Sequence, residues 1–167
     1  VGDGTTALGT FALYSQNSDS DNEETGNVGV GYKASFYNET GKGNTYLGYE
    51  AGLGVSGQSN SYNIGIGDQS MKLIRTGTEN VCVGGKTMQD LDAGTLAGSS
   101  SSNVFVGYEA GSGAWANTQT VGVVAVGQGA MSGLLDNVDG TVAIGNAALA
   151  ALTTGAGNTA IGYNSCL

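Results

Sequence analysis

The chain has 167 residues, including 31 Gly but neither His nor Pro, and it carries a formal net charge of −9. Without His it cannot form a Ser–His or Cys–His nucleophile or a His-ligated metal centre. Because Pro is absent and Gly has no three-residue period, it is not collagen, and its negative charge opposes binding to nucleic acid. These features disfavour most enzyme classes and predict a single domain over residues 1–167.

Hydrophobic residues make up 40% of the chain, which is compatible with a folded, water-soluble protein. No apolar run approaches the ~20 residues of a membrane helix. The sequence begins at Val1 without a signal peptide, so we expect a processed or excised piece. Cys82 and Cys166 lie in apolar stretches and are expected to be small buried side chains rather than redox groups or ligands.

A seven-residue unit recurs nine times along the chain, with Gly at its fourth position and Ala, Ser or Thr at its seventh. In chain order the units span 6–12, 28–34, 45–51, 64–70, 81–87, 104–110, 124–130, 142–148 and 159–165. Their key glycines are Gly9, Gly31, Gly48, Gly67, Gly84, Gly107, Gly127, Gly145 and Gly162. Spacings of 17 to 23 residues between these glycines indicate stacked rungs with loops of variable length.

The three residues before each key Gly predict a short β-strand. The first and third are Val, Ile, Leu or Thr, and the second is mostly small, with Tyr46 and Phe105 as exceptions. Because side chains alternate along a strand, the first and third share one face. We expect this β-branched face to form the core and the small face to allow close approach of another surface.

After each key Gly, which tolerates positive φ, a small and often an apolar residue follow, and we expect a second short strand there. The apolar residues are Leu13, Met71, Met88, Met131, Leu149 and Cys166. A turn-forming Asn precedes most units, at Asn27, Asn44, Asn63, Asn80, Asn103 and Asn158. Such residues could stack as ladders in a rod of nine rungs about 40 Å long.

Four segments, NTYLGYEAG, NVFVGYEAG, GNTAIGYNS and TVAIGNAAL, resemble the head repeats of trimeric autotransporter adhesins. They resemble even more closely the GNTAIGY-type repeats of phage tail-fibre and tailspike proteins, and the likeness covers residues 5–167. It implies an all-β, left-handed parallel β-roll assembled as an obligate homotrimer, with the small strand face suited to a neighbouring chain. Asn lies one residue closer to Gly, and the repeat is longer, than in adhesin heads, which favours the phage-fibre branch.

The resemblance implies a structural, adhesive fibre segment on a phage or virion, extracellular or at the virion surface, without enzymatic activity or cofactor. Its partners would be two further copies of itself, other fibre or virion proteins, and a cell-surface glycan or protein, but neither nucleic acid nor an inserted membrane. The head of a bacterial trimeric surface adhesin is one alternative. A polysaccharide-degrading tailspike is another.

Acidic residues offer formal sites of other kinds. The loop 17–24, with Asp19, Asp21, Glu23 and Glu24, is either a calcium-binding segment or, as we expect, a solvated insertion. The pairs Asp90 with Asp92, Asp136 with Asp139, and Glu50 with Glu109 could in principle serve glycoside hydrolysis, although nothing singles out any of them.

Aromatic residues supply the predicted contact sites. Tyr32, Tyr49, Tyr108 and Tyr163 each follow a key Gly directly. An aligned, exposed row of rings could stack on sugars, whereas the alternative is that the rings pack over neighbouring rungs. Trp115 lies in a predicted insertion loop and is expected to be an exposed contact residue.

Overall fold

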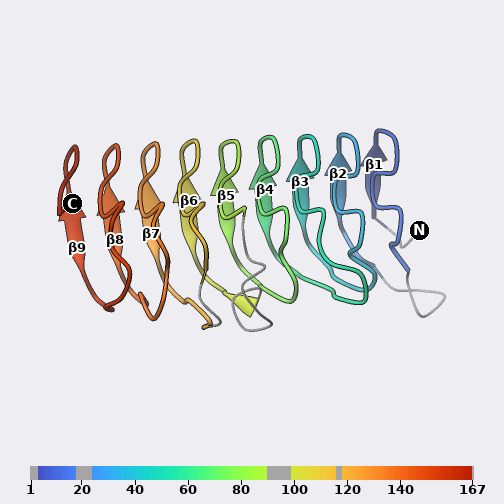
Figure 1. The fold of residues 1–167 in the computed structure, drawn as a ribbon. Coiled ribbons are helices and arrows are strands. Elements are labelled where there is room, and N and C mark those ends of the chain that lie inside the picture. The colour runs from blue at the N-terminus through green and yellow to red at the C-terminus, as the bar shows by residue number, and fades with distance from the viewer. Residues whose placement is uncertain (1–3, 18–23, 90–98, 116–117, 167) are drawn as a thin grey trace.

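The computed structural model describes residues 4–17, 24–89, 99–115 and 118–166. These residues form one β-solenoid of about eight turns, in which nine short strands stack side by side in chain order (Figure 1). The strands are β1 (Thr6–Leu8), β2 (Val28–Val30), β3 (Thr45–Leu47), β4 (Ile64–Ile66), β5 (Val81–Val83), β6 (Val104–Val106), β7 (Val124–Val126), β8 (Val142–Ile144) and β9 (Thr159–Ile161). All nine predicted strands and the all-β solenoid are therefore confirmed. The described segments contain no helix able to span a membrane.

Equivalent residues of successive units lie side by side in the parallel sheet. Thr45 of β3 pairs with Ile64 of β4, for example, and Val81 of β5 pairs with Val104 of β6. Insertions between units, such as residues 54–60, therefore leave the register unchanged. This regularity is what the repeat spacing predicts, because each unit can bury its apolar groups only against its neighbours.

The key glycines are required by both backbone conformation and stacking. Their φ angles lie between 129° and 142°, a region that is almost restricted to Gly. In addition, a Cβ atom on Gly84 would lie 2.6 Å from the carbonyl oxygen of Gly107 in the next rung. Any side chain at this corner would thus push successive rungs apart.

The buried face of the strands is the opposite of the one that we expected. The second residue of every strand from β2 to β9 is buried, whereas the first and third are half-buried or exposed. Tyr46, Cys82 and Phe105 are fully buried at this inner strand position, while Leu47 is 45% exposed. The predicted β-branched core is therefore wrong, and the small face lines the interior instead of facing a neighbouring chain.

The second strand predicted after each key Gly is also wrong. Residues two and four positions after it have positive φ, as in Gln69 (53°) and Met71 (55°), which curls the chain into a narrow loop beyond each arrowhead (Figure 1). Backbone bonds between rungs continue through this loop. Gln69 N donates to Tyr49 O at 2.8 Å, and Met71 N donates to Thr87 O at 2.9 Å.

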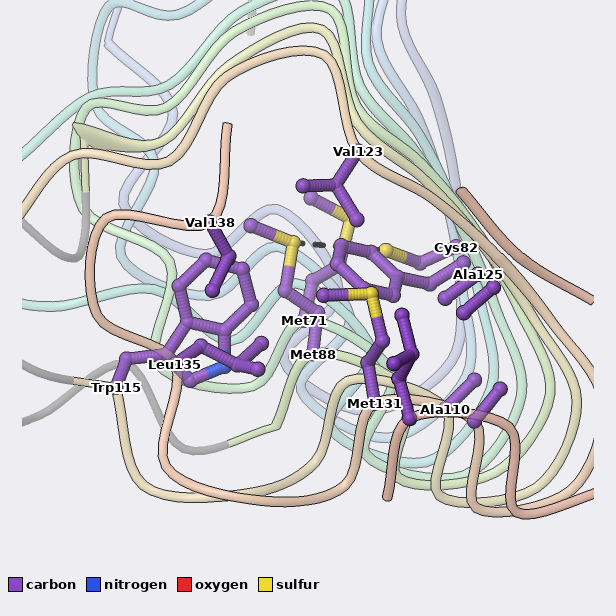
Figure 2. Packing of buried hydrophobic residues seen from close by; sticks show 14 of the residues in the cluster. Met71, Cys82, Met88, Ala110, Trp115, Val123, Ala125, Met131, Leu135 and Val138 are labelled. Atoms are coloured by element: carbon purple, nitrogen blue, oxygen red, sulfur yellow. Dashed lines mark hydrogen bonds between the residues drawn. The ribbon is translucent and has the colours of Figure 1, made fainter. Parts of the chain in front are cut away.

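The interior is filled by side chains of complementary size at two positions. Opposite the inner strand position lies the facing position, four residues after the key Gly. Where the inner residue is large, the facing residue is Gly: a Cβ on Gly52 would collide with the Tyr46 ring, and one on Gly111 with the Phe105 ring. In four other rungs a small inner residue has a large facing residue: Gly65 with Met71, Cys82 with Met88, Ala125 with Met131, and Ala143 with Leu149. The pairs Cys82 with Met88 and Ala125 with Met131 are labelled in Figure 2. The rung of β2 is an exception, because Gly29 has the small Ser35 as its facing residue and the Leu13 side chain of the preceding rung lies against Gly29.

The predicted asparagine ladder is confirmed over five rungs. The buried side chains of Asn27, Asn44, Asn63, Asn80 and Asn103 form it. Within it, Asn80 Oδ1 accepts hydrogen bonds from Asn103 N at 3.2 Å and from Asn103 Nδ2 at 3.0 Å. The ladder ends where the repeat supplies Val123, whose N–H donates to Asn103 Oδ1 at 2.9 Å. Asn158 lies outside it and donates to Gly155 O.

The two cysteines have different environments. Cys82 is buried at the inner strand position of β5, as expected, and its Sγ lies 3.7 Å from Met88 Sδ. Burial raises the pKa of the Cys82 thiol well above its ordinary value, so it is an unreactive apolar group. Cys166, at the facing position of the rung of β9, is exposed, contrary to our expectation.

Candidate functional site

The outer face of the sheet carries a continuous apolar strip. The strip consists of the first and third residues of all nine strands: Thr6, Leu8, Val28, Val30, Thr45, Leu47, Ile64, Ile66, Val81, Val83, Val104, Val106, Val124, Val126, Val142, Ile144, Thr159 and Ile161. None of these side chains is charged, although the chain as a whole carries 19 charged residues. Leu8, Leu47, Ile64, Ile144 and Ile161 are the exposed large apolar residues of the strip.

The size of the apolar strip can be compared with that of known interaction surfaces. Nine strands at the usual sheet spacing make it about 40 Å long and about 10 Å wide, or roughly 400 Å². The largest apolar patch on a monomeric soluble protein usually covers about 300–600 Å² and often has a function. Stable protein interfaces bury about 800 Å² on each partner, so the strip could form the apolar centre of such an interface, with polar neighbours as its rim.

A second surface lies on the loops that follow β1, β2 and β3. The aromatic patch comprises Phe11, Tyr14, Tyr32, Phe36 and Tyr49. Tyr14 stacks on Phe36 with ring centroids 4.9 Å apart, and Tyr32 stacks on Tyr49 at 5.4 Å. Phe11 meets Tyr14, Tyr32 and Phe36 edge to face. Four of the five rings are 39% to 65% exposed.

One cation lies within the aromatic patch. Lys33 Nζ is 5.3 Å from the Tyr32 ring centroid and 5.5 Å from that of Phe36, which is the range of favourable cation–π contacts. The ion pair beside the patch joins Lys72 Nζ to Glu50 Oε2 at 2.8 Å. The Glu50 carboxylate in turn raises the pKa of Tyr49, first through its negative charge and also by accepting a hydrogen bond from the phenol.

The predicted tyrosine row is only partly continuous. Tyr32 and Tyr49 stack on each other across neighbouring rungs and also remain exposed. This pair therefore combines the exposed row of rings with the packing of rings over neighbouring rungs, which we had treated as alternatives. Tyr108 is 47% exposed, but the equivalent residues of the adjacent rungs are Gly85 and Gln128. Tyr163 is 77% exposed on the last rung, where the preceding rung offers Asn146. Whether any of these tyrosines contacts a ligand stays a prediction.

The prediction for Trp115 is wrong. Its side chain is fully buried, its ring lies 5.7 Å from that of Phe105, and its Nε1 donates to Gly111 O at 2.9 Å. A parallel bridge to Leu135 places residue 115 within a rung rather than at a loop tip. Trp115 closes the far end of the core beside Leu135 and Val138 (Figure 2).

The Glu50 and Glu109 pair does not have the geometry of a hydrolytic site. The two residues occupy the same repeat position on the rungs of β3 and β6, three rung spacings or about 14 Å apart. The two carboxylates of a glycosidase lie only about 5–10 Å apart. This pair therefore cannot cooperate within one chain.

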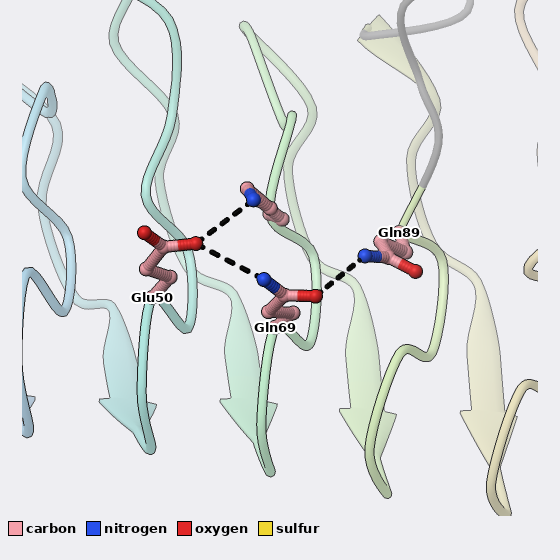
Figure 3. A network of polar contacts seen from close by, with 4 residues as sticks. Glu50, Gln69 and Gln89 are labelled. Carbon is pink, nitrogen blue, oxygen red and sulfur yellow. Dashed lines mark hydrogen bonds and ion pairs between the residues drawn. The ribbon is translucent and has the colours of Figure 1, made fainter.

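Glu50 instead belongs to a structural network. It accepts hydrogen bonds from Lys72 and from Gln69 Nε2, and Gln89 Nε2 donates to Gln69 Oε1 at 2.8 Å (Figure 3). Burial raises the pKa of Glu50, but the hydrogen bonds from Lys72 and Gln69 lower it by more, so it lies below the ordinary value. The carboxylate is thus ionised at neutral pH, unlike a general acid.

The remaining acidic residues have other roles or lie outside the described residues. Asp136 accepts a hydrogen bond from Thr118 Oγ1, and Asp139 accepts one from Val121 N, so both tie adjacent rungs together. Asp90 and Asp92, and most of the proposed calcium loop, fall in segments that the structure does not describe. Among the described residues, no group of three or more Cys, Asp or Glu side chains could hold a metal ion.

Sequence reasoning missed three members of the aromatic patch. Tyr14 and Phe36 both lie five residues after a key Gly, and Phe11 lies two residues after one. Aligning the units beyond their seventh residue would have placed Tyr14 next to Phe36. For Tyr14 and Phe36 the signal was therefore present but fell outside the repeat as we defined it, whereas Phe11 is the sixth residue of the unit 6–12 and was overlooked within it.

A scan against protein-family models finds no match, and searches of curated proteins and of solved structures find no significant one.

Proposed function

We propose that this chain is a structural, adhesive segment of a trimeric fibre on a phage or virion, outside the cell. In this proposal three left-handed β-rolls pack through their apolar strips. Their loops attach the fibre to a cell-surface glycan or protein, and its ends join other fibre or virion proteins. Attachment would be multivalent, because three chains display each loop three times.

The observation that carries the proposal is the apolar strip. A roll that already fills its own interior has no need of Leu47, Ile64 or Ile144 on its outer face, and exposed apolar side chains of this kind favour association with a second surface. A second copy of the same chain fits best, because the strip has the length of the whole roll and a uniform rung spacing.

The distribution of charge is compatible with the same arrangement. The net charge of −9 keeps free chains apart at long range. The strip itself contains no charged residue, so pairing there does not bury like charges against each other. The head of a bacterial surface adhesin would have the same architecture but would belong to a bacterial surface and not to a phage or virion, and no observation on this chain favours it.

The mass of the purified chain in solution tests the proposal. Light scattering is expected to give three times 16.6 kDa. The double variant Val104→Lys with Val126→Lys places two charges at the centre of the strip, and we expect a monomer with an unchanged β-type circular dichroism spectrum. The control Gln128→Lys with Asn146→Lys adds the same charge on the exposed loops and should remain trimeric.

A monomeric wild-type chain, or a charged-strip variant that stays trimeric, would refute the proposal. If the lysine variant fails to fold, Val104→Thr with Val126→Thr keeps the side-chain shape and should raise the concentration at which the trimer dissociates. New reducing ends released from a host polysaccharide, and lost on replacing Asp136 and Asp139, would instead identify a degrading tailspike.

A further inference from the structure

The aromatic patch is a compact surface on one end of the roll. Its five rings span the rungs of β1 to β3, two rung spacings or about 10 Å along the axis. In the next rung the equivalent positions hold Asp68, Gln69 and Lys72, which are polar. Four rings that each expose about half of their roughly 150–250 Å² give the patch an area on the order of 400 Å², about half of the ~800 Å² per partner of a stable protein interface. A small ligand unit fits it better than a folded protein does.

The chemistry of the patch combines apolar rings with outward hydrogen-bond donors. Tyr14, Tyr32 and Tyr49 each present an aromatic ring with a polar tip at the surface. The Lys33 ammonium, fixed against two rings, offers further N–H donors. Sugars have the matching surface, because their C–H faces are apolar and their edges carry hydroxyl groups.

Charge decides which sugars fit. The chain carries −9 overall and only five basic residues, so a polyanion would be repelled at long range. Close to the patch, Glu50 is neutralised by Lys72, and Lys33 supplies a single positive charge. One cation is far short of the several phosphate contacts on which nucleic-acid binding depends. These charges favour an uncharged ligand.

We propose that the aromatic patch is the attachment site for a neutral glycan, with Tyr32, Tyr49 and Lys33 as its central contacts. This inference rests on the attachment role proposed above and names the site and the ligand class. Tyr14 and Phe11 extend the surface towards the first rung, and Phe36 supports both Tyr14 and Lys33 from below.

The chain contains its own control for this site. Tyr108 and Lys86 occupy the same repeat positions as Tyr49 and Lys33, and Lys86 Nζ lies 6.0 Å from the Tyr108 ring centroid. Tyr108 has no aromatic neighbour at the equivalent position of either adjacent rung. If a cluster of rings is what binds sugar, Tyr108 should contribute little although it is as exposed as Tyr49.

The test measures binding of soluble mannan, dextran and β-glucan to the purified chain by affinity electrophoresis and calorimetry. We expect at least one of these neutral polysaccharides to bind. Tyr32→Ser with Tyr49→Ser should weaken binding by about tenfold or more, and Lys33→Gln by several-fold. The controls Tyr108→Ser and Lys86→Gln should change it by less than about twofold. Binding should also be nearly the same at about 50 and 500 mM salt, because no ionic contact dominates.

Failure of all three neutral polysaccharides to bind would overturn the inference, as would equal losses in the patch and control variants. Binding of only polygalacturonate or of a single-stranded oligonucleotide would also overturn it. The mass of each variant is measured in parallel. Patch variants that lose the trimer would make the patch a subunit contact, which refutes the glycan site and leaves the fibre proposal standing. Glycan binding by a monomeric wild-type chain would refute the trimer and keep the glycan site.

Discussion

The size complementarity between the inner strand position and the facing position can be tested by exchanging the large residue. Phe105→Ala removes a fully buried ring that packs against Trp115, and such a change costs about 3–5 kcal/mol of unfolding free energy. Adding Gly111→Met recreates the arrangement of Ala125 with Met131 in the next rung. The new methionine would occupy the space that the ring has left.

The expected magnitudes follow from the structure. In the wild-type background Gly111→Met collides with the Phe105 ring and should destabilise by about 2–5 kcal/mol, from overpacking and from a side chain at positive φ. In the Phe105→Ala background it should be neutral or stabilising by up to about 2 kcal/mol, because burying Met contributes about 1.5–3 kcal/mol. Met131 has a φ of 51°, close to the 63° of Gly111, so the backbone can accept the change.

Urea unfolding followed by fluorescence measures all four proteins, since Trp115 is the single tryptophan and is buried. Chain concentration is held constant, because any association adds to apparent stability. The double-mutant cycle should give a coupling of at least about 2 kcal/mol. If Gly111→Met has the same effect in both backgrounds, the two positions do not share one space and the packing rule is wrong.

Three further predictions concern the ladder, the strand orientation and the loop network. Asn80→Ala breaks the middle of the ladder: it removes the Nδ2 donor to Ser100 O and Asn63 Oδ1 and the Oδ1 acceptor of Asn103 N and Nδ2, while Asn63 Oδ1 keeps the backbone N–H of residue 80. Thermal unfolding should therefore show a loss of about 3 kcal/mol or more, against less than about 1 kcal/mol for Asn158→Ala. A maleimide should label Cys166 within minutes and Cys82 only on unfolding, because Cys82 is buried and burial raises the pKa of its thiol. If mass spectrometry shows that both cysteines are labelled rapidly, the second residue of each strand faces outward and the assigned orientation is wrong. The pKa of Glu50 is lowered in the folded state, so its contribution to the free energy of unfolding is present above the ordinary value of 4.5 and is lost as pH falls through the folded pKa. In urea titrations, the stability difference between wild type and Glu50→Gln, about 1 kcal/mol or less, should therefore vanish at that lower pH.

The repeat pattern was sufficient for the position of every strand. A period of two over three residues, followed by Gly, marked all nine, and the recurring Asn marked the ladder from Asn27 to Asn103. Both features are local to one rung and repeat along the axis, so a single sequence displays them several times. The loop after each key Gly was less predictable. Its alternating positive φ angles fall on residues such as Met71 and Lys33, whose side chains give no sign of that conformation.

Which face of the strands is buried could not be predicted from alternation alone. A period of two identifies two faces but does not say which one is inside, and hydrophobicity favoured the β-branched face. The interior is too narrow for that choice, since Tyr46 fits only opposite Gly52 and Phe105 only opposite Gly111. At Trp115, too, the sequence alone did not show that the side chain faces the interior. A large residue in a long insertion looks like a loop contact until the bridge to Leu135 places it in a rung.

Because the second residue of each strand faces inward and the first and third face outward, folding and association depend on different residues. Since each roll completes its core with residues of its own chain, from Leu13 to Ala160, the apolar strip is not needed to fill the interior. Changes on the strip, such as Val104→Lys, should therefore alter the mass of the assembly with little change in the β structure of each chain. Changes at inner positions, such as Phe105→Ala, should weaken the fold and leave the chemistry of the strip intact. Had the β-branched face been the core, charges there would abolish folding and association together. Comparing the two kinds of variant by light scattering and circular dichroism thus tests the strand orientation and the proposed assembly as separate properties.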